Sequence, residues 1–271
     1  GSIVPSNFKV DVTESISHPF TGTKDKDLMT DTIPGNELYE HLANFIYIGE
    51  AAADIVPNIM TFIAVYNINH AVDLTYISDE DGRYKHLVVI EGSDYEGVNY
   101  EYQLTITDQD LESAADGGKA IQVFWNTYPV KGVSIIKPAN FDVTAYASSE
   151  FSETMYRVDY SEAGEYSYDA HMIVSITGLP LGDPLTTPYS VSNLKMFAGR
   201  NGNIIDVYGN SDHPNAKFYN DDVGFNWAFV AAGKKVEDIG VAEVGLPPST
   251  LDASDRTTLL DTNSMENVLS A

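Results

Sequence analysis

Acidic side chains gather around an irregular segment, residues 208–222, that is rich in Asn, Asp and Gly. Calcium prefers carboxylate and carbonyl oxygens as ligands, and a loop of this composition could enclose such a cation. The alternative is an ordinary solvated loop. The candidate calcium ligands are Asp206, Asp212, Asp221 and Asp222. The sequence indicates no other cofactor.

Other motifs that carry chemistry are missing from the sequence. The chain has no cysteine, and its six histidines include no HExxH arrangement that would place two imidazoles on one zinc ion. No GxSxG elbow, P-loop or GxGxxG motif occurs. With 40 acidic residues, two carboxylates could meet in almost any fold. A carboxylate-dependent hydrolase is therefore a remote alternative, and the sequence favours a non-enzymatic role.

Tyrosine is the most abundant aromatic residue, with 17 Tyr beside 11 Phe and 2 Trp. A tyrosine combines an apolar ring with a polar tip, so a sheet face rich in tyrosine could line a concavity for an amphipathic or glycan ligand. The alternative is packing within strands, which also favours tyrosine. The candidate ligand-binding residues are Tyr100, Tyr102, Trp125, Tyr166, Tyr168 and Trp227.

The chain is strongly acidic, with 15 Lys and Arg against 40 Asp and Glu and a net charge of −25. This charge disfavours nucleic acid and anionic membrane surfaces as partners, because each phosphate contact would oppose the field of the protein. The sequence also lacks a run of about 18 uncharged apolar residues, so we expect no transmembrane span.

Alternation of apolar and polar residues predicts antiparallel strands from residue 72 to residue 231. The longest predicted strand covers about 12 residues, 166–177, and a further strand is predicted at 141–146. Hairpin turns are expected at Asp79–Gly82 and at Asn201-Gly202. The proline-rich segment 179–189 should be a surface crossover that separates two halves of the sheet.

Before the strands, the sequence predicts an amphipathic helix over residues 36–66, kinked near Pro57. Gly49 falls on the apolar side of this helix and Thr61 on the polar side. We expect a polar arm at 1–35, a single α+β domain at 36–250 and a weakly helical segment at 251–271. The predicted fold is a large, curved antiparallel sheet or barrel, with the kinked helix packed on it.

The acidic, Tyr- and Asn-rich, cysteine-free composition, the Gly1-Ser2 start and the polar first 35 residues resemble the uncharacterised exported lipoproteins of Gram-negative gut bacteria. The strand-rich body is also somewhat similar to calycin or lipocalin-type barrels. The first resemblance implies a location in the periplasm or on the outer cell surface, with a lipid-bearing cysteine upstream of this sequence. We expect a binding protein for a small amphipathic or glycan ligand, or alternatively a structural or adhesion component of the cell surface.

Overall fold

A computed structural model describes residues 71–182, 191–213, 225–234 and 239–245, together with Gly49, Thr61 and Val236. The chain divides into two compact units. The first comprises residues 1–10 and 52–180, and the second comprises residues 11–51 and 181–271. The division between Pro180 and Leu181 falls inside the proline-rich segment that was predicted to separate two halves of the sheet.

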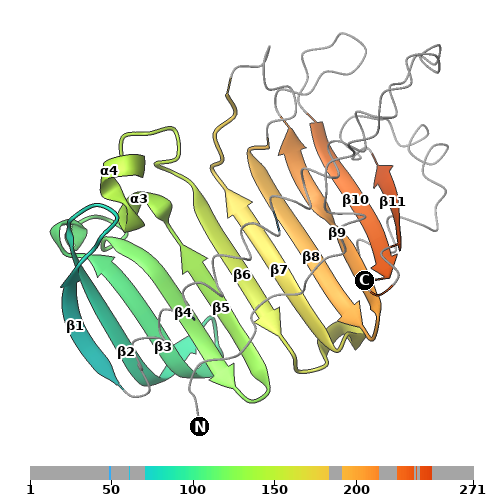
Figure 1. Cartoon of the computed structure of the whole chain (residues 1–271), viewed down its shortest axis with the longest axis horizontal. Helices are drawn as coiled ribbons and strands as arrows, with labels where there is room; N and C mark the ends of the chain where they lie inside the picture. The colour runs from blue at the N-terminus through green and yellow to red at the C-terminus, as the bar shows by residue number, and fades with distance from the viewer. Residues whose placement is uncertain are drawn as a thin grey trace. The chain divides into compact units, whose positions relative to one another are not determined.

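Within the first unit, strands that are consecutive in sequence pair antiparallel with each other. Figure 1 shows β1 to β7 side by side in this order, with two short helices at one end of the strands. Such a meander follows from tight turns between alternating apolar and polar runs. The strands are β1 (Val72–Ile77), β2 (Tyr84–Tyr95), β3 (Val98–Asp108), β4 (Lys119–Thr127), β5 (Val130–Ile136), β6 (Met155–Ser161) and β7 (Ala170–Thr177).

The register places the main core of the first unit on one face of its sheet, which we call the Trp125 face. Alternate residues of a strand point to the same face. Residues that pair directly across two strands also share a face, as Leu104 does with Val123 and Val158 does with Val174. All four of these side chains are fully buried. The prediction of antiparallel strands with one covered face is confirmed for this unit.

The opposite face carries a smaller aromatic cluster at the tip of the β2–β3 hairpin. Tyr95 stacks on Phe124 with 4.2 Å between ring centroids, and Tyr100 lies 6.0 Å from the same ring. Arg157 of β6 lies 5.8 Å from the centre of the Tyr95 ring and donates one hydrogen bond to each carboxylate oxygen of Glu96, both at 2.8 Å. These contacts fasten the hairpin tip to β6.

The strand predicted at 141–146 is wrong, because two single-turn helices occupy this region, α3 (Pro138–Phe141) and α4 (Val143–Tyr146). Pro138 stands in the first turn of α3, where a missing backbone N–H costs nothing. The carboxylate of Asp142 accepts a hydrogen bond from the amide of Ala145 and caps α4. These capping signals outweigh the short alternation that suggested a strand.

The second unit contains another antiparallel meander, formed by β8 (Asn193–Asn201), β9 (Ile204–His213), β10 (Phe225–Lys234) and β11 (Ile239–Gly245). The hairpin at Asn201-Gly202 is confirmed. The irregular segment predicted to begin at residue 208 instead continues as strand to His213, because β9 is paired on both sides, with β8 and with β10. β11 was not predicted.

Two residues of the predicted helix 36–66 are described, and both are helical. Gly49 is buried against Met196 of β8, and a Cβ added there would lie 2.6 Å from the Met196 sulfur. Thr61 is exposed. Both observations agree with the predicted apolar and polar sides. The rest of this helix and the predicted segments 1–35 and 251–271 lie outside the described residues.

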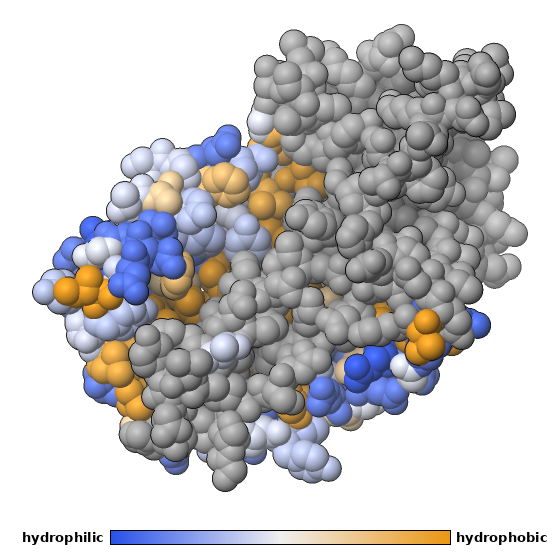
Figure 2. Space-filling view, in the orientation of Figure 1, coloured by the Kyte–Doolittle hydropathy of each residue, from blue (hydrophilic) through white to orange (hydrophobic). Residues whose placement is uncertain are grey.

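The described residues are thus mostly antiparallel sheet with a few short helices. In the described part of the chain, no helix has the length and hydrophobicity that crossing a membrane requires. On the face shown in Figure 2, hydrophilic and hydrophobic residues both reach the described surface, with much of the hydrophilic surface toward its margins.

Candidate functional site

Two of the predicted ligand-binding residues form a stacked pair on one face of the sheet. Trp125 and Tyr102 are direct cross-strand partners on the Trp125 face, and their rings stack with centroids 5.5 Å apart. Trp125 is completely buried. An aromatic pair in this position stabilises β3 against β4, and the structure places Trp125 in the core with the half-buried Tyr102 beside it.

Tyr100 and Tyr166 do not join that pair. Tyr100 is 6% exposed and contacts Phe124 in the aromatic cluster at the β2–β3 tip. Tyr166 is 62% exposed and meets His171 edge to face, with ring centroids 4.9 Å apart. His171 alternates with Met172, whose partner Tyr160 is on the Trp125 face, so His171 lies on the opposite face. The predicted tyrosines therefore do not share one surface.

The long strand predicted at 166–177 is wrong at its start. Residues Glu165–Ser167 form a 3-10 turn, and Tyr166 and Ser167 both have positive φ, at 55° and 68°. β7 begins only at Ala170. This turn brings Tyr166 and the half-buried Tyr168 into the connection between β6 and β7 instead of the sheet. The alternation of residues 166–169 gave no sign of the turn.

The remaining predicted residues are spread over the second unit. Asp206 and Asp212 are six residues apart on β9, which separates their Cα atoms by about 20 Å, so they do not bind one cation together. Asp221 and Asp222 lie outside the described residues. For Trp227, the structure describes only the backbone, which pairs with Ser211. Among the described residues, no three His, Asp or Glu side chains gather as a metal site requires.

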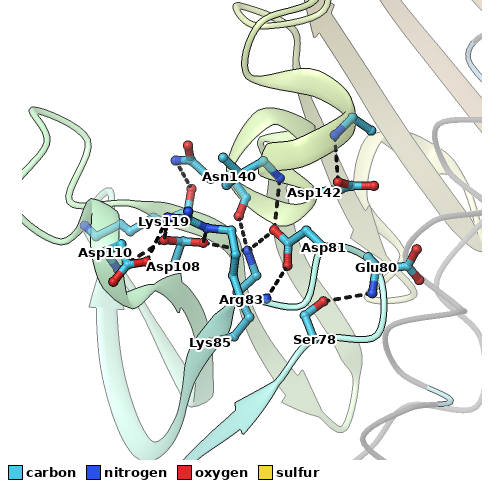
Figure 3. A network of polar contacts seen from close by, with 12 residues as sticks. Ser78, Glu80, Asp81, Arg83, Lys85, Asp108, Asp110, Lys119, Asn140 and Asp142 are labelled. Atoms are coloured by element: carbon cyan, nitrogen blue, oxygen red, sulfur yellow. Dashed lines mark hydrogen bonds and ion pairs between the residues drawn. The ribbon is translucent and has the colours of Figure 1, made fainter.

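A charged network that was not predicted occupies one end of the first sheet, near α3 and α4 (Figure 3). At its centre, the ammonium of Lys85 is buried and donates to three acceptors. These are Asp81 Oδ2 at 2.8 Å, Asp108 Oδ2 at 2.7 Å and the backbone carbonyl of Asn140 at 3.0 Å. A lysine ammonium has three N–H groups, so each of them has an acceptor here.

Like that of Asp81, the carboxylate of Asp108 is fully enclosed in this network. Its side chain is fully buried and receives two hydrogen bonds from the Arg83 guanidinium, both at 2.7 Å. Burial by itself would raise the pKa of Asp108, but the hydrogen bonds from Arg83 and Lys85 outweigh it and lower the pKa to about 2. Asp108 is therefore ionised at neutral pH and balanced by two cations.

The same network joins segments that are distant in sequence. Asp81 accepts hydrogen bonds from the amides of Arg83 and Val143, at 3.1 and 3.0 Å. These bonds and the one from Lys85 lower the pKa of Asp81 against the opposing effect of its burial. The hairpin turn at Asp79–Gly82, predicted from its sequence, is thereby tied to α4.

A third carboxylate, Asp116, extends the network toward β4. The ammonium of Lys137 donates to Asp116 at 2.6 Å and the side-chain amide of Asn140 donates to it at 2.9 Å. The Lys137 hydrogen bond is the main reason that the pKa of Asp116 falls to about 2, with burial opposing it. We call Asp81, Arg83, Lys85, Asp108, Asp116, Lys137 and Asn140 the network end of the sheet.

The sequence contains a signal for this network, although the network was not predicted from it. Lys85 lies on the same strand face as Leu87 and Val89, and Asp108 lies on the same strand face as Leu104 and Ile106. A charge at a core position of an apolar strand needs a partner of opposite sign, and the two strands are neighbours. Because cations and carboxylates satisfy each other here, the arrangement serves as a structural staple rather than as a nucleophile or a proton carrier.

The other end of the first sheet presents exposed tyrosines on two adjacent connections, residues 127–130 and 161–169, which we call the tyrosine end. Tyr128 is 90% exposed, and Tyr166 is 62% exposed. The connections are held together by a backbone hydrogen bond from Glu162 to Val130 at 2.8 Å and by the ion pair of Lys131 with Glu165. Two exposed aromatic side chains are thus carried on a braced support.

No family model, curated protein or solved structure matches this chain.

Proposed function

We propose that this protein is a non-enzymatic binding protein that contacts a glycan through its tyrosine end. The observation that supports this most is the exposure of Tyr128 and Tyr166 on two braced neighbouring connections. Exposed tyrosines cost little conformational entropy on binding, and their rings offer flat apolar surface beside a hydroxyl. The C–H face of a sugar ring complements such a surface.

The polar groups around these tyrosines fit the same ligand class. Glu162 and Asp169 are exposed on the 161–169 connection, and Asn126 and Thr127 lie at the end of β4. Carboxylates accept hydrogen bonds from sugar hydroxyl groups, and side-chain amides both donate to them and accept from them. The proposed contact surface lies on loops at the end of the sheet, and not in a concavity lined by Trp125, which is fully buried, and the half-buried Tyr102.

We favour binding over catalysis because the best-built charged group of the described residues, the network end, is internally satisfied. A catalytic carboxylate pair needs two groups whose pKa values differ, whereas Asp108 and Asp116 both have pKa values lowered to about 2. A carboxylate held ionised by hydrogen-bonded cations is a poor general acid.

The finer architecture and the location are also part of this proposal. We propose a curved sheet on which the helix 36–66 packs, supported by the contact of Gly49 with Met196. We place the protein in the periplasm or on the outer cell surface, with a lipid anchor attached upstream of this sequence, as the acidic composition and the polar first 35 residues suggest. Surface biotinylation and fractionation of the source cells would test this location.

The binding proposal is tested with a glycan array, followed by titration calorimetry of the glycans retained. The double variant Tyr128→Ala with Tyr166→Ala should lose binding at least about tenfold, which corresponds to about 1.4 kcal/mol. The matched control is Tyr84→Ala, since Tyr84 is 56% exposed but is the first residue of β2, at the network end. Equal losses in both variants, or no glycan retained by the natural chain, would reject the proposal and favour a scaffold or adhesion role.

A further inference from the structure

The first strand of the sheet, β1, stands at the edge of the first unit. It pairs with β2 over all six residues in an unbroken register, from Val72 opposite Val89 to Ile77 opposite Tyr84. In the described part of the chain, β1 has β2 as its one strand neighbour, and Figure 1 shows it as the outermost strand. Four of its six residues are exposed. An edge strand of this kind has backbone N–H and C=O groups that point away from the sheet.

Among the described residues, this edge has only one of the features that usually prevent strand pairing, the charged side chain of Asp73. Protected edges carry Lys or Pro, a β-bulge, or a very short strand. The sequence of β1, VDLTYI, contains neither Lys nor Pro, and its register with β2 is continuous. Two large apolar side chains remain at the surface, Leu74 at 39% exposed and Ile77 at 56% exposed. The strand therefore offers both a backbone ladder and side-chain contacts.

The charge around this edge is acidic on one face. Asp73 is 76% exposed and contacts His86 at 2.8 Å, and Glu112 lies 3.9 Å from the other ring nitrogen of His86. Asp73 lies on the face that also carries Ile77, because residues 73, 75 and 77 point to the side opposite Leu74. An incoming strand would therefore meet an acidic group near one end of β1 and an apolar one at the other.

We propose that β1 binds an extended, basic segment of another protein by strand addition. The main-chain hydrogen bonds would supply affinity, and the side chains at alternate positions would supply specificity. In the antiparallel orientation, the partner places an apolar residue beside Ile77, a second apolar residue beside Leu74 and a Lys or Arg beside Asp73. The choice of a basic segment follows from charge complementarity with Asp73 and with the net charge of −25.

A second copy of this chain is a poorer occupant. Pairing of β1 with its own symmetry mate would bring two acidic strands together, each with an exposed Asp73, between molecules that both carry a charge of −25. Like charges across an interface cost affinity and slow association. Self-association is therefore an outcome that the test must separate from binding of a basic partner.

The probe is an acetylated, amidated peptide of sequence Thr-Val-Thr-Thr-Val-Lys-Thr, which matches this pattern in the antiparallel orientation. Two matched peptides accompany it, one with Glu in place of Lys and one with methyl groups on alternate backbone nitrogens. Titration calorimetry at low ionic strength gives the affinity for the full chain, and hydrogen exchange reports protection of the amides of residues 72–77. Binding of the first peptide should slow exchange in β1, and each matched peptide should bind at least about tenfold more weakly.

The protein variant is Ile77→Lys, which places a positive charge on the edge, and its matched control is Ile204→Lys. Ile204 is also an exposed isoleucine, at 46%, but it lies on β9 in the second unit. Both substitutions change the net charge equally. Ile77→Lys should weaken peptide binding about tenfold or more, and Ile204→Lys should change it less than about twofold.

Several results would overturn the proposal. These are a failure of the first peptide to protect β1 at millimolar concentration, equal binding of the N-methylated peptide, and equal weakening by Ile204→Lys. Sedimentation velocity of the chain without peptide provides the last arm. A dimer that Ile77→Lys converts to a monomer would show that the edge is occupied by a second copy instead.

Discussion

The two ends of the first sheet handle polar residues in opposite ways. At the network end, Lys85 and Asp108 are buried and each is bound by partners from several segments. At the tyrosine end, Tyr128 and Tyr166 reach solvent and the ion pair of Lys131 with Glu165 is itself partly exposed. Buried charges must be paired or they cost several kcal/mol, whereas exposed side chains cost little. The comparison indicates that the network end stabilises the fold, whereas the tyrosine end exposes side chains that can contact a ligand.

The largest expected effect is the loss of the buried cation. Lys85→Met leaves Asp81 and Asp108 without their shared ammonium, and we expect a loss of about 3–5 kcal/mol in the free energy of unfolding. Urea unfolding followed by tryptophan fluorescence measures this. The matched variant at the tyrosine end is Lys131→Met, whose side chain is 32% exposed. It should cost less than about 1 kcal/mol, and equal costs at the two positions would remove the distinction between the ends.

A pair of glycines provides the next comparison. Gly118, near the network end, has a φ of +65°, and an added Cβ would lie 2.8 Å from the Asp108 carbonyl oxygen. Gly164, at the tyrosine end, has a φ of +72° but an open surrounding. We expect Gly118→Ala to lower the free energy of unfolding by about 2–4 kcal/mol and Gly164→Ala to lower it by about 1 kcal/mol. Both variants place a Cβ on a residue with positive φ, but only Gly118→Ala also creates a clash with the backbone. Thermal and urea unfolding of both variants would check this, and a costlier Gly164→Ala would contradict it.

Acid should weaken the network end. The folded-state pKa values of Asp108 and Asp116 are about 2, below their ordinary value of 3.8, so the unfolded chain binds more protons in this range. Their contribution to stability is therefore complete above about pH 5 and is lost as the pH falls from about 4 to about 2. Urea midpoints of the natural chain and of Asp116→Asn at intervals between pH 6 and pH 2 measure this. The variant should show a shallower loss, and parallel curves would contradict the assignment.

The smallest stability effect is expected at the exposed tyrosines. Tyr128→Ala and Tyr166→Ala should each change the free energy of unfolding by less than about 0.5 kcal/mol, because both rings are mostly in solvent. Urea unfolding of each single variant, beside the calorimetric titration with glycan, separates binding from folding. A loss of more than about 2 kcal/mol in either would mean that the ring supports the fold rather than a ligand.

The sequence predicted the sheet well where alternation and turn residues agree. β2, the turn at Asp79–Gly82 and the hairpin at Asn201-Gly202 follow from local pattern and glycine chemistry. The start of β7 and the helices α3 and α4 did not follow, since positive φ at Tyr166 and the capping role of Asp142 depend on local geometry that a period-two pattern does not encode.

The candidate site was harder to predict than the fold. Alternation shows which residues share a face of one strand, but it does not say whether that face is covered. Trp125 and Tyr166 therefore looked equivalent in sequence, although one is fully buried and the other is 62% exposed. The partners of Lys85 lie 4, 23 and 55 residues away along the chain. The hairpin turn supplies Asp81, the pairing of β2 with β3 supplies Asp108, and α3 supplies the carbonyl of Asn140.

The sequence-order pairing of the strands also has a consequence for how the protein is made. Within each unit, a new strand finds its partner in the strand synthesised just before it, so the sheet can grow one hairpin at a time as the chain emerges. Local contacts of this kind form quickly because little loop entropy is lost. The Arg157–Glu96 ion pair, which joins residues 61 apart, can form only once β6 has been added. This ion pair therefore joins β6 to the β2–β3 hairpin after that hairpin has formed.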